Sequence, residues 1–220
     1  MRIGIIGAGN IGGNLARRLT AAGHEVRIAN SRGPETLAEL AAETGAVAVR
    51  AEEAAADADV VVVTIPLKAV AGLPSGILDA RRPGAPVVDT NNYYPQQRDG
   101  RIDAIEDDGL TESDWVAQQL GVPVVKAFNG IYAAKIVEDA RPAGAPDRLA
   151  LPIAGDEAEA KAVVSGLIDD VGFDVVDAGP LPESWRQQPG TPSYGASLDV
   201  DGLRLALAQA ARERPAEFRG

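Results

Sequence analysis

The sequence predicts an α/β fold: a doubly wound, mostly parallel sheet with a smaller C-terminal α/β unit packed on it. Three observations support this prediction. The apolar run 3–6 leads directly into a glycine-rich stretch at residues 7–12, and a helical pattern follows. Strand-like and helix-like segments then alternate as far as residue 130. The segment Asp59–Thr64 contains four consecutive valines, which is typical of a parallel strand covered on both faces.

The other elements of the first part follow in order from apolar periodicity and turn residues. The second strand is expected at His24–Ala29, after the turn at Gly23. Pro34 suits the first turn of a helix and Glu35 its positive end, which predicts a helix over 34–44. A short strand at 47–49 and a small helix at 51–56 precede the valine strand. Further strands are expected at 86–88 and 122–126, with a helix at 113–120 between them whose start at 111–114 offers capping side chains.

Beyond residue 129 the alternation is less regular. The stretch 141–146 predicts an exposed loop. A β–α–β unit follows, with a strand at Leu149–Ala154, a helix at Glu157–Asp170 and a strand at Phe173–Asp177. A final helix is expected at Asp201–Glu213. We therefore predict a first domain at 1–130 and a smaller C-terminal unit at 131–220.

The stretch 7–12 has the G-x-G-x-x-G spacing of a dinucleotide fingerprint, placed between a first strand and a first helix. Gly7 permits the tight turn, Gly9 lets the backbone approach a pyrophosphate, and Gly12 lets helix and strand pack closely. The helix N-terminus that follows offers unpaired N–H groups to phosphates. The first domain is therefore expected to bind a dinucleotide.

The end of the second strand indicates which dinucleotide is bound. Sites for NAD usually place a carboxylate there, to accept hydrogen bonds from the ribose 2′-OH. This chain has Asn30, Ser31 and Arg32 instead, which can donate hydrogen bonds to a 2′-phosphate. We therefore expect NADP(H). The alternative is that Ser31 and Arg32 only cap and solvate the helix that begins near Pro34.

Composition excludes several classes of protein. The net charge of −11 and the absence of a basic stripe argue against nucleic acid. The chain has no cysteine and one histidine, so thiolate sites, cysteine nucleophiles and histidine-based metal clusters are excluded. No apolar run approaches the roughly 20 residues that span a bilayer, and the apolar N-terminal run is assigned to the first strand rather than to a signal peptide. We expect a cytoplasmic protein without a metal site, in which the acidic residues at 103–108 form a solvated loop.

Three predicted strands end in distinctive polar segments, and ligands of such sheets bind at the carboxyl ends of the strands. These segments are Thr64-Ile65-Pro66, the run 89–94 with Asn91 at its centre, and the run 126–132. Any one of these segments could serve only to form hydrogen bonds with the backbone amides of turns or to cap helices. Three polar strand ends in one crevice favour a ligand-binding site. No histidine or lysine is placed as an evident proton relay, which suits hydride transfer to a ring acceptor that brings its own proton chemistry.

These residues together resemble the NADPH-dependent deazaflavin (coenzyme F420) reductase family of Rossmann dinucleotide-binding enzymes, over nearly the whole chain. The motifs that carry the resemblance are 7–12, 30–32, 64–66, 125–129, 154–156 and 177–181. The resemblance implies that Ala8, Gly9, Asn10 and Ile11 hold the pyrophosphate and that Ser31 and Arg32 hold the 2′-phosphate. It further implies that Thr64, Ile65 and Ala133 lie along the nicotinamide half. The motif 126–129 is also similar to the cytosolic domain of six-transmembrane metalloreductases, which pair NADPH with a flavin.

The chain departs from the resemblance at two positions. Archaeal deazaflavin reductases carry a histidine where this chain has Asn129 and a proline where it has Tyr132. An amide can donate a hydrogen bond but does not exchange a proton near neutral pH.

The sequence therefore predicts an NADPH-dependent oxidoreductase that transfers hydride to or from a deazaflavin or, as second choice, a flavin. The nicotinamide site should include Pro66 and Asn91. Thr64, Asn129 and Ile131 should line the acceptor site, and Trp185 is a further candidate for its wall. The alternatives are reduction of a small carbonyl or imine, and an NADPH-binding sensor without catalysis. The small-molecule acceptor is the expected partner, and a homodimer is one expected oligomeric form.

Overall fold

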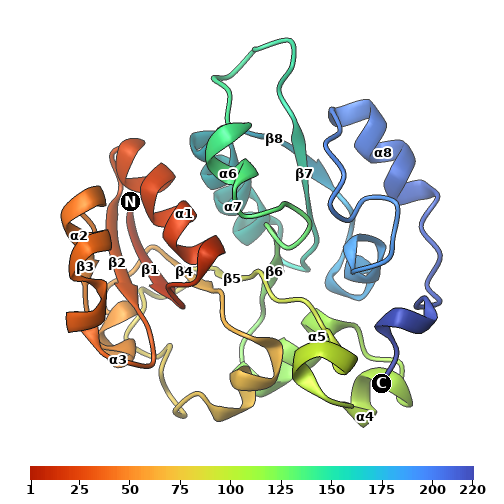
Figure 1. Ribbon diagram of the computed structural model, residues 1–220, viewed down its shortest axis with the longest axis horizontal. Helices are drawn as coiled ribbons and strands as arrows, with labels where there is room; N and C mark the ends of the chain where they lie inside the picture. The colour runs from red at the N-terminus through yellow and green to blue at the C-terminus, as the bar shows by residue number, and fades with distance from the viewer.

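The main layer of the computed structural model, which describes residues 1–220, is a six-stranded parallel sheet in the order β3-β2-β1-β4-β5-β6 (Figure 1). Its strands are β1 Arg2–Ile6, β2 Glu25–Ala29, β3 Val47–Ala48, β4 Val60–Val63, β5 Val87–Asp89 and β6 Val125–Lys126. Every neighbouring pair is parallel. The predicted doubly wound, Rossmann-like α/β fold is confirmed, with each strand within three residues of its expected start.

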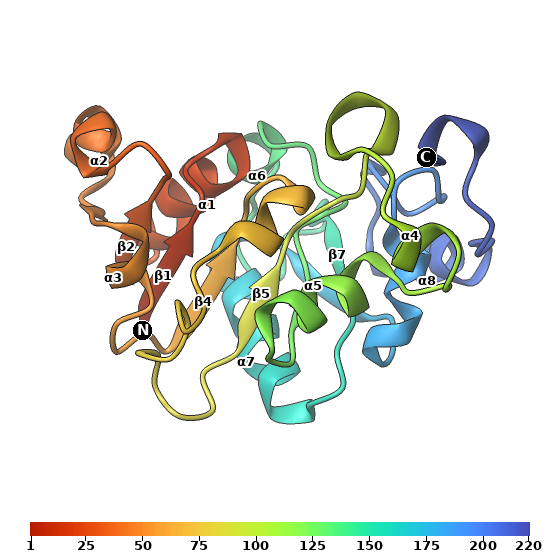
Figure 2. The ribbon, with the colours of Figure 1, turned by 90° about the horizontal axis from the view of Figure 1, so that it is seen from below.

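The helices cover both faces of this sheet (Figures 1 and 2). The helices of the chain are α1 Asn10–Ala21, α2 Ala38–Thr44, α3 Ala51–Ala54, α4 Asp103–Glu106, α5 Glu112–Leu120, α6 Lys135–Glu138, α7 Ala158–Val171 and α8 Val200–Ala208, and the last of them packs on a smaller second sheet. The valine strand explains the two-sided packing. Val60 and Val62 belong to the apolar core formed with α1 and α7, whereas Val61 and Val63 belong to the core formed with α3 and α5. Because side chains alternate along a strand, a continuous apolar run requires a layer on each face.

The C-terminal unit is a small parallel sheet of β7 Ala150–Ile153 and β8 Asp174–Asp177, with α7 and α8. It joins the main sheet through an antiparallel bridge between Lys126 and Ala154, whose backbones exchange hydrogen bonds of 2.8 and 3.1 Å. Apolar residues of β7 and α7 belong to the same core as those of β1 and α1. The smaller unit is therefore packed on the first part through shared apolar contacts rather than by a linker.

Two predicted helices differ from the structure. The helix expected at 34–44 begins as a 3-10 turn at Pro34–Leu37 and becomes α-helical only at Ala38. The last helix ends at Ala208 instead of Glu213. The chain beyond it turns toward α5, where the Nη2 atom of Arg214 lies 2.9 Å from Glu112 Oε1, and Pro215 cannot donate a helical hydrogen bond. A tertiary ion pair therefore overrides the helical periodicity of the tail.

A second correction concerns the acidic stretch after residue 100. Residues 103–106 form one turn of helix, α4, rather than a loop. Arg101 is paired with both Asp103 and Asp107, which fixes the turn. The predicted cap at Thr111 is confirmed, because its hydroxyl accepts from the backbone N–H of Asp114 and the Asp114 carboxylate accepts from the backbone N–H of Thr111.

A buried ionic cluster connects the strand ends with α5 and the C-terminal tail. The Nζ atom of Lys126 lies 3.4 Å from Asp89 Oδ2 and 3.4 Å from Glu112 Oε2, and it donates to the backbone carbonyl of Asn91. These three charged side chains are at most 3% exposed. Arg214 adds a second cation on Glu112. The cluster therefore balances two cations with two carboxylates inside the protein.

Lys126→Met should destabilise the fold by about 3–5 kcal/mol, because it leaves two buried carboxylates with a single cation. Urea unfolding followed by circular dichroism measures this loss. The matched change Lys135→Met removes a half-buried i,i+4 pair with Asp139 and a hydrogen bond to Ser197, and should cost about 0–1 kcal/mol. Equal losses in the two variants would contradict a structural role for the cluster.

Candidate functional site

The turn between β1 and α1 is built around glycines that have no room for a side chain. A Cβ at Gly7 would lie 2.1 Å from the carbonyl oxygen of Thr64, and one at Gly12 would lie 2.0 Å from the carbonyl oxygen of Gly7. Gly7 also has a φ of +116°, a conformation that favours glycine. At Gly9, by contrast, a Cβ would meet no atom within 4 Å. The space beside Gly9 is therefore open, as the approach of a pyrophosphate requires.

The N-terminus of α1 has free donors beside this open space. Its N-cap is Gly9, which supplies no capping side chain, and its first turn holds no acidic residue. The first N–H groups of a helix have no intrahelical partner, and they attract anions together with the helix dipole. The chain therefore fits a dinucleotide pyrophosphate at this point.

Two cavities meet at the start of α1 and form one crevice. The cavity of about 580 Å³ extends toward Arg32 between α1 and α2, and the cavity of about 360 Å³ extends toward the ends of β4, β5 and β6. Both are lined by Gly9, Asn10 and Ala133. Ala133 is held there because the Asn14 side chain donates a 2.7 Å hydrogen bond to its carbonyl. The crevice therefore connects the end of β2 with the carboxyl ends of the central strands.

Most of the sequence-predicted site residues line this crevice, and the rest support it. The lining includes Ala8, Gly9, Asn10, Ile11, Arg32, Thr64, Ile65, Pro66, Asn91, Asn129, Ile131 and Ala133. Gly7 and Gly12 lie behind the turn, and Ser31 is exposed next to Arg32. The side chain of Asn30 supports the loop, since it accepts from the backbone N–H of Arg32 and donates to Thr36. The Arg32 guanidinium makes no hydrogen bond or ion pair within the chain.

The sequence missed several residues at the outer end of the crevice. Asn14 and Arg17, on successive turns of α1, line it together with Thr36. Arg17 forms a bidentate ion pair with Glu43, at 2.6 and 2.7 Å, and this pair raises the pKa of the guanidinium and lowers that of the carboxyl. Asn14 and Arg17 face outward on α1 like ordinary surface residues, so only the position of α2 reveals their place.

Two asparagines at the inner end of the crevice are in opposite states. The Asn91 side chain is buried, and neither its Nδ2 nor its Oδ1 atom has a partner. Asn129 is also buried, but its Nδ2 donates to Asn92 Oδ1 and to the Gln187 carbonyl, and its Oδ1 accepts from Gln187 Nε2. Buried polar groups are almost always hydrogen-bonded. Asn91 is therefore available to a ligand, whereas Asn129 connects the crevice with the C-terminal unit.

The backbone beside Asn129 is strained. Phe128 has a φ of +59°, which non-glycine residues rarely adopt, and its ring is almost fully buried against the crevice. Such conformations concentrate at functional sites, where the surrounding packing holds them. The strain turns the chain so that Asn129 and Ile131 both reach the crevice.

A pair of tyrosines is the main feature of the inner crevice that the sequence did not predict. The hydroxyl groups of Tyr94 and Tyr194 are hydrogen-bonded to each other, although the residues are 100 positions apart. Burial, and then the bond to Tyr94, raise the pKa of Tyr194 well above its usual value. Both rings line the inner crevice, the cavity of about 360 Å³, whose lining contains no histidine, lysine or carboxylate. Only the fold brings this pair together.

Other candidates lie away from the crevice. Trp185 lines a separate cavity next to α4 and α5, so it does not form the wall of the acceptor site. His24 contacts Asp170 at 3.1 Å, on the opposite edge of the sheet. No three acidic or histidine side chains are grouped as a metal site would need. None of the helices combines the length and the hydropathy needed to cross a bilayer.

Comparison with known proteins agrees with this geometry. Residues 2–93 match the family described as NADP oxidoreductase, coenzyme F420-dependent. The structure of the hypothetical protein SMa0349 from Sinorhizobium meliloti is 35% identical, with a TM-score of 0.74, and the alignment covers 90% of this chain and 94% of that one. A segment of 53 residues is 53% identical to the Escherichia coli (strain K12) protein YjhV, and it covers 24% of this chain and 39% of that protein.

A more distant structure shares the fold. The protein named "putative F420 dependent NADP-reductase" from Arthrobacter sp. FB24 is 24% identical, with a TM-score of 0.66 over 84% of this chain and 87% of that one. The fingerprint turn, the sheet order, the family match and the relative that is similar over its whole length agree with one another. This chain belongs to the coenzyme F420-dependent NADP oxidoreductase family and is a Rossmann-type, NADP-dependent oxidoreductase.

Proposed function

We propose that this chain transfers hydride between NADP(H) and a deazaflavin or flavin that lies in the inner crevice. The observation that carries the proposal is the make-up of the inner lining, which combines amides, tyrosines and apolar side chains with Arg98 as its one charged group. The Arg98 guanidinium is itself bound to Asp99 at 2.9 Å and to the Asn92 carbonyl at 2.6 Å. Such a lining can orient a flat ring, whereas the proton chemistry is left to the ring itself.

The outer crevice would hold the adenosine half of the cofactor. Arg32 would bind the 2′-phosphate with its free guanidinium, and Ser31 would donate a hydroxyl next to it. The N–H groups at the start of α1 would bind the pyrophosphate. The bound nicotinamide supplies the hydride, and the free amide of Asn91 would hold that end of the cofactor in place.

The acceptor would then lie between the ends of β5 and β6 and the segment around Tyr194. Ile131 and Phe128 offer apolar contact for a ring, and Thr64 lies at the end of β4 on the side of the cofactor. Asn129 would act as a positioning residue, because its amide already holds Asn92 and Gln187 in place. Donor and acceptor carbons must approach to roughly 3–3.5 Å, so small errors of position at these residues would slow the hydride step.

The Tyr94–Tyr194 pair favours a second candidate function, reduction of a small carbonyl or imine. A tyrosine hydroxyl that stays protonated can donate a hydrogen bond or a proton to the oxygen or nitrogen of such a substrate. The raised pKa of Tyr194 keeps its hydroxyl protonated throughout the neutral range.

The acceptor class is tested by following NADPH absorbance with deazaflavin, flavins and a panel of small carbonyls and imines. We expect oxidation with a ring acceptor, at a single-turnover rate that varies little between about pH 6 and 8, because no histidine, lysine or carboxylate lines the inner crevice. Tyr194→Phe should change this rate less than threefold. Turnover with carbonyls alone, lost in Tyr194→Phe, would support the second candidate. Binding of NADPH with no turnover on any acceptor would indicate a sensor.

Ser31→Ala combined with Arg32→Ala should weaken NADPH binding far more than NADH binding. Each charge-assisted hydrogen bond to a phosphate contributes about 1.5–3 kcal/mol, so the loss for NADPH should be at least about tenfold. Fluorescence titration with the two cofactors measures the difference. Equal weakening would show that the 2′-phosphate lies elsewhere.

Gly9→Val and Gly12→Ala should have different effects. The valine side chain would enter the open space needed by the pyrophosphate, so NADPH binding should be lost, while the poorer N-cap should lower stability by only about 0.5–1 kcal/mol. The Cβ at position 12 would collide with the backbone of Gly7, which should lower the free energy of unfolding by about 1–3 kcal/mol. NADPH titration and urea unfolding of both variants separate the two effects.

Asn91→Ala should weaken NADPH binding by up to about tenfold, which is the contribution of one or two neutral hydrogen bonds. Its stability should hardly change, because the side chain has no partner within the chain. Asn129→Ala is the matched variant, since it breaks three internal hydrogen bonds and should lower both stability and turnover. Unchanged NADPH affinity in Asn91→Ala would remove Asn91 from the cofactor site.

A further inference from the structure

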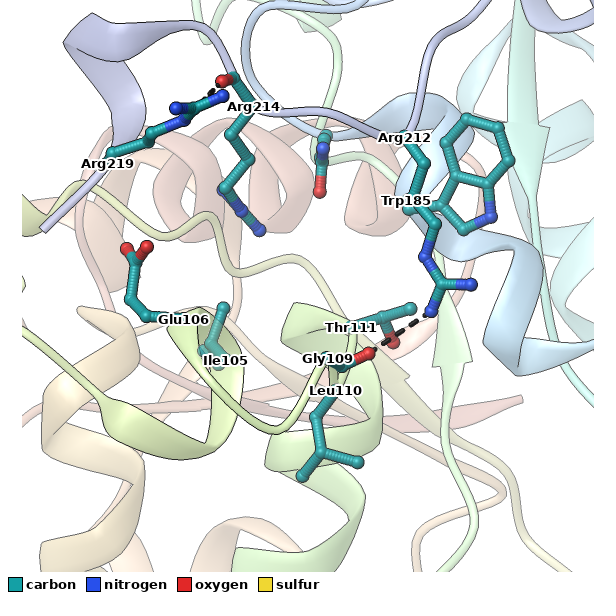
Figure 3. A pocket seen from close by; sticks show the side chains of 10 residues that line it. Ile105, Glu106, Gly109, Leu110, Thr111, Trp185, Arg212, Arg214 and Arg219 are labelled. Atoms are coloured by element: carbon teal, nitrogen blue, oxygen red, sulfur yellow. Dashed lines mark hydrogen bonds between the residues drawn. The ribbon is translucent and has the colours of Figure 1, made fainter.

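A second cavity lies outside the crevice, between the loop that follows α4 and the C-terminal tail (Figure 3). Its volume is about 340 Å³, and it shares no lining residue with the crevice. Three arginines of the tail line it, Arg212, Arg214 and Arg219, together with Thr111 at the start of α5 and Trp185. Nothing in the proposed hydride transfer uses this cavity.

Arg214 is the central observation, because its side chain is only 10% exposed and still has a free donor. Its Nη2 atom lies 2.9 Å from Glu112 Oε1, and its guanidinium lies 5.3 Å from the centre of the Tyr93 ring. The Nη1 atom is buried and has no hydrogen-bond partner. Figure 3 shows the guanidinium reaching into the cavity. A buried charged donor without a partner is costly, so an oxygen in the cavity is its natural acceptor.

The other two arginines point to the same kind of ligand. Arg212 donates to the Gly109 carbonyl at 3.1 Å, and Arg219 donates to the Arg214 carbonyl at 2.8 Å and to Glu213. A guanidinium has five N–H donors, so each keeps donors that could turn to a ligand. The lining has one carboxylate, Glu106, which accepts from the backbone N–H of Gly220. Three arginines and one carboxylate therefore line the cavity, while Glu112 and Glu213, the ion-pair partners of Arg214 and Arg219, lie outside its lining.

We propose that this cavity is a binding site for a small organic anion that carries a carboxylate or a phosphate group. The forked donors of arginine match both groups. The volume lies at the lower end of the range for small-molecule sites. The site is separate from the NADP crevice, so its occupancy does not depend on the hydride-transfer proposal.

The test is a titration with inorganic phosphate and, separately, with succinate, against chloride at equal ionic strength. Trp185 lines the cavity, so its fluorescence should change saturably with one of the two probes, and the melting temperature should rise with the same midpoint. Phosphate and succinate distinguish the two classes of anion. Arg212→Ala with Arg219→Ala should weaken binding by about tenfold or more, and both side chains are exposed, so the fold should persist.

Two controls decide where the anion binds. Arg204→Ala together with Arg50→Ala removes the same charge from exposed positions outside the cavity lining and should leave the affinity unchanged. Arg32→Ala removes the phosphate contact proposed in the crevice and should also leave it unchanged. The proposal fails if neither probe gives a saturable response, if the control pair weakens binding as much as the cavity pair, or if Arg32→Ala abolishes it.

Discussion

Most of this structure depends on the interactions of one buried group, the ammonium of Lys126. Its Nζ atom contacts Asp89 at the end of β5 and Glu112 at the start of α5, and it donates to the Asn91 carbonyl at the edge of the crevice. The backbone of the same residue forms the bridge to Ala154, which joins the second sheet to the first. One residue therefore fixes the distance between the ends of two strands, the start of a helix and the C-terminal unit.

This arrangement has a consequence for the site. Asp89 is not free to act in the crevice, because its Oδ1 accepts from the Asn91 backbone and its Oδ2 from Ser113. The Asp89 carboxylate holds the backbone of Asn91, and the side-chain amide of Asn91 is left without a partner. The charged residues near the strand ends thus act as supports, and the groups exposed to a ligand are neutral amides and hydroxyls. A neutral, preorganised lining suits a reaction in which the cofactor and the acceptor supply the chemistry.

The arginines of this acidic chain have two roles, which their hydrogen-bond partners distinguish. Arg17, Arg98 and Arg101 are each paired with carboxylates and hold local structure. Arg32 has no partner, and one nitrogen of Arg214 has none either. These two lie in different cavities, one at the end of β2 and the other against α5. In a protein with a large negative charge, a guanidinium nitrogen that lies in a cavity without an acceptor is the feature that most directly indicates an anionic ligand, and Arg214 has one although its other nitrogen is paired with Glu112.

The sequence alone determined the fold class and predicted the glycine turn and Arg32 of the outer crevice, but not Asn14, Arg17 and Thr36. The spacing of Gly7, Gly9 and Gly12 and the four valines of β4 act through local sterics and alternation, which need no knowledge of distant residues. The tertiary structure decided the rest. The hydrogen bonds of Asn129, the free amide of Asn91 and the Tyr94–Tyr194 pair depend on segments that are far apart in sequence. The end of α8 is a further example. The helical periodicity of the tail continues to Glu213, but α8 ends at Ala208 and the chain turns so that Arg214 pairs with Glu112. A buried charge pair outweighs the small helix propensity of a few exposed residues.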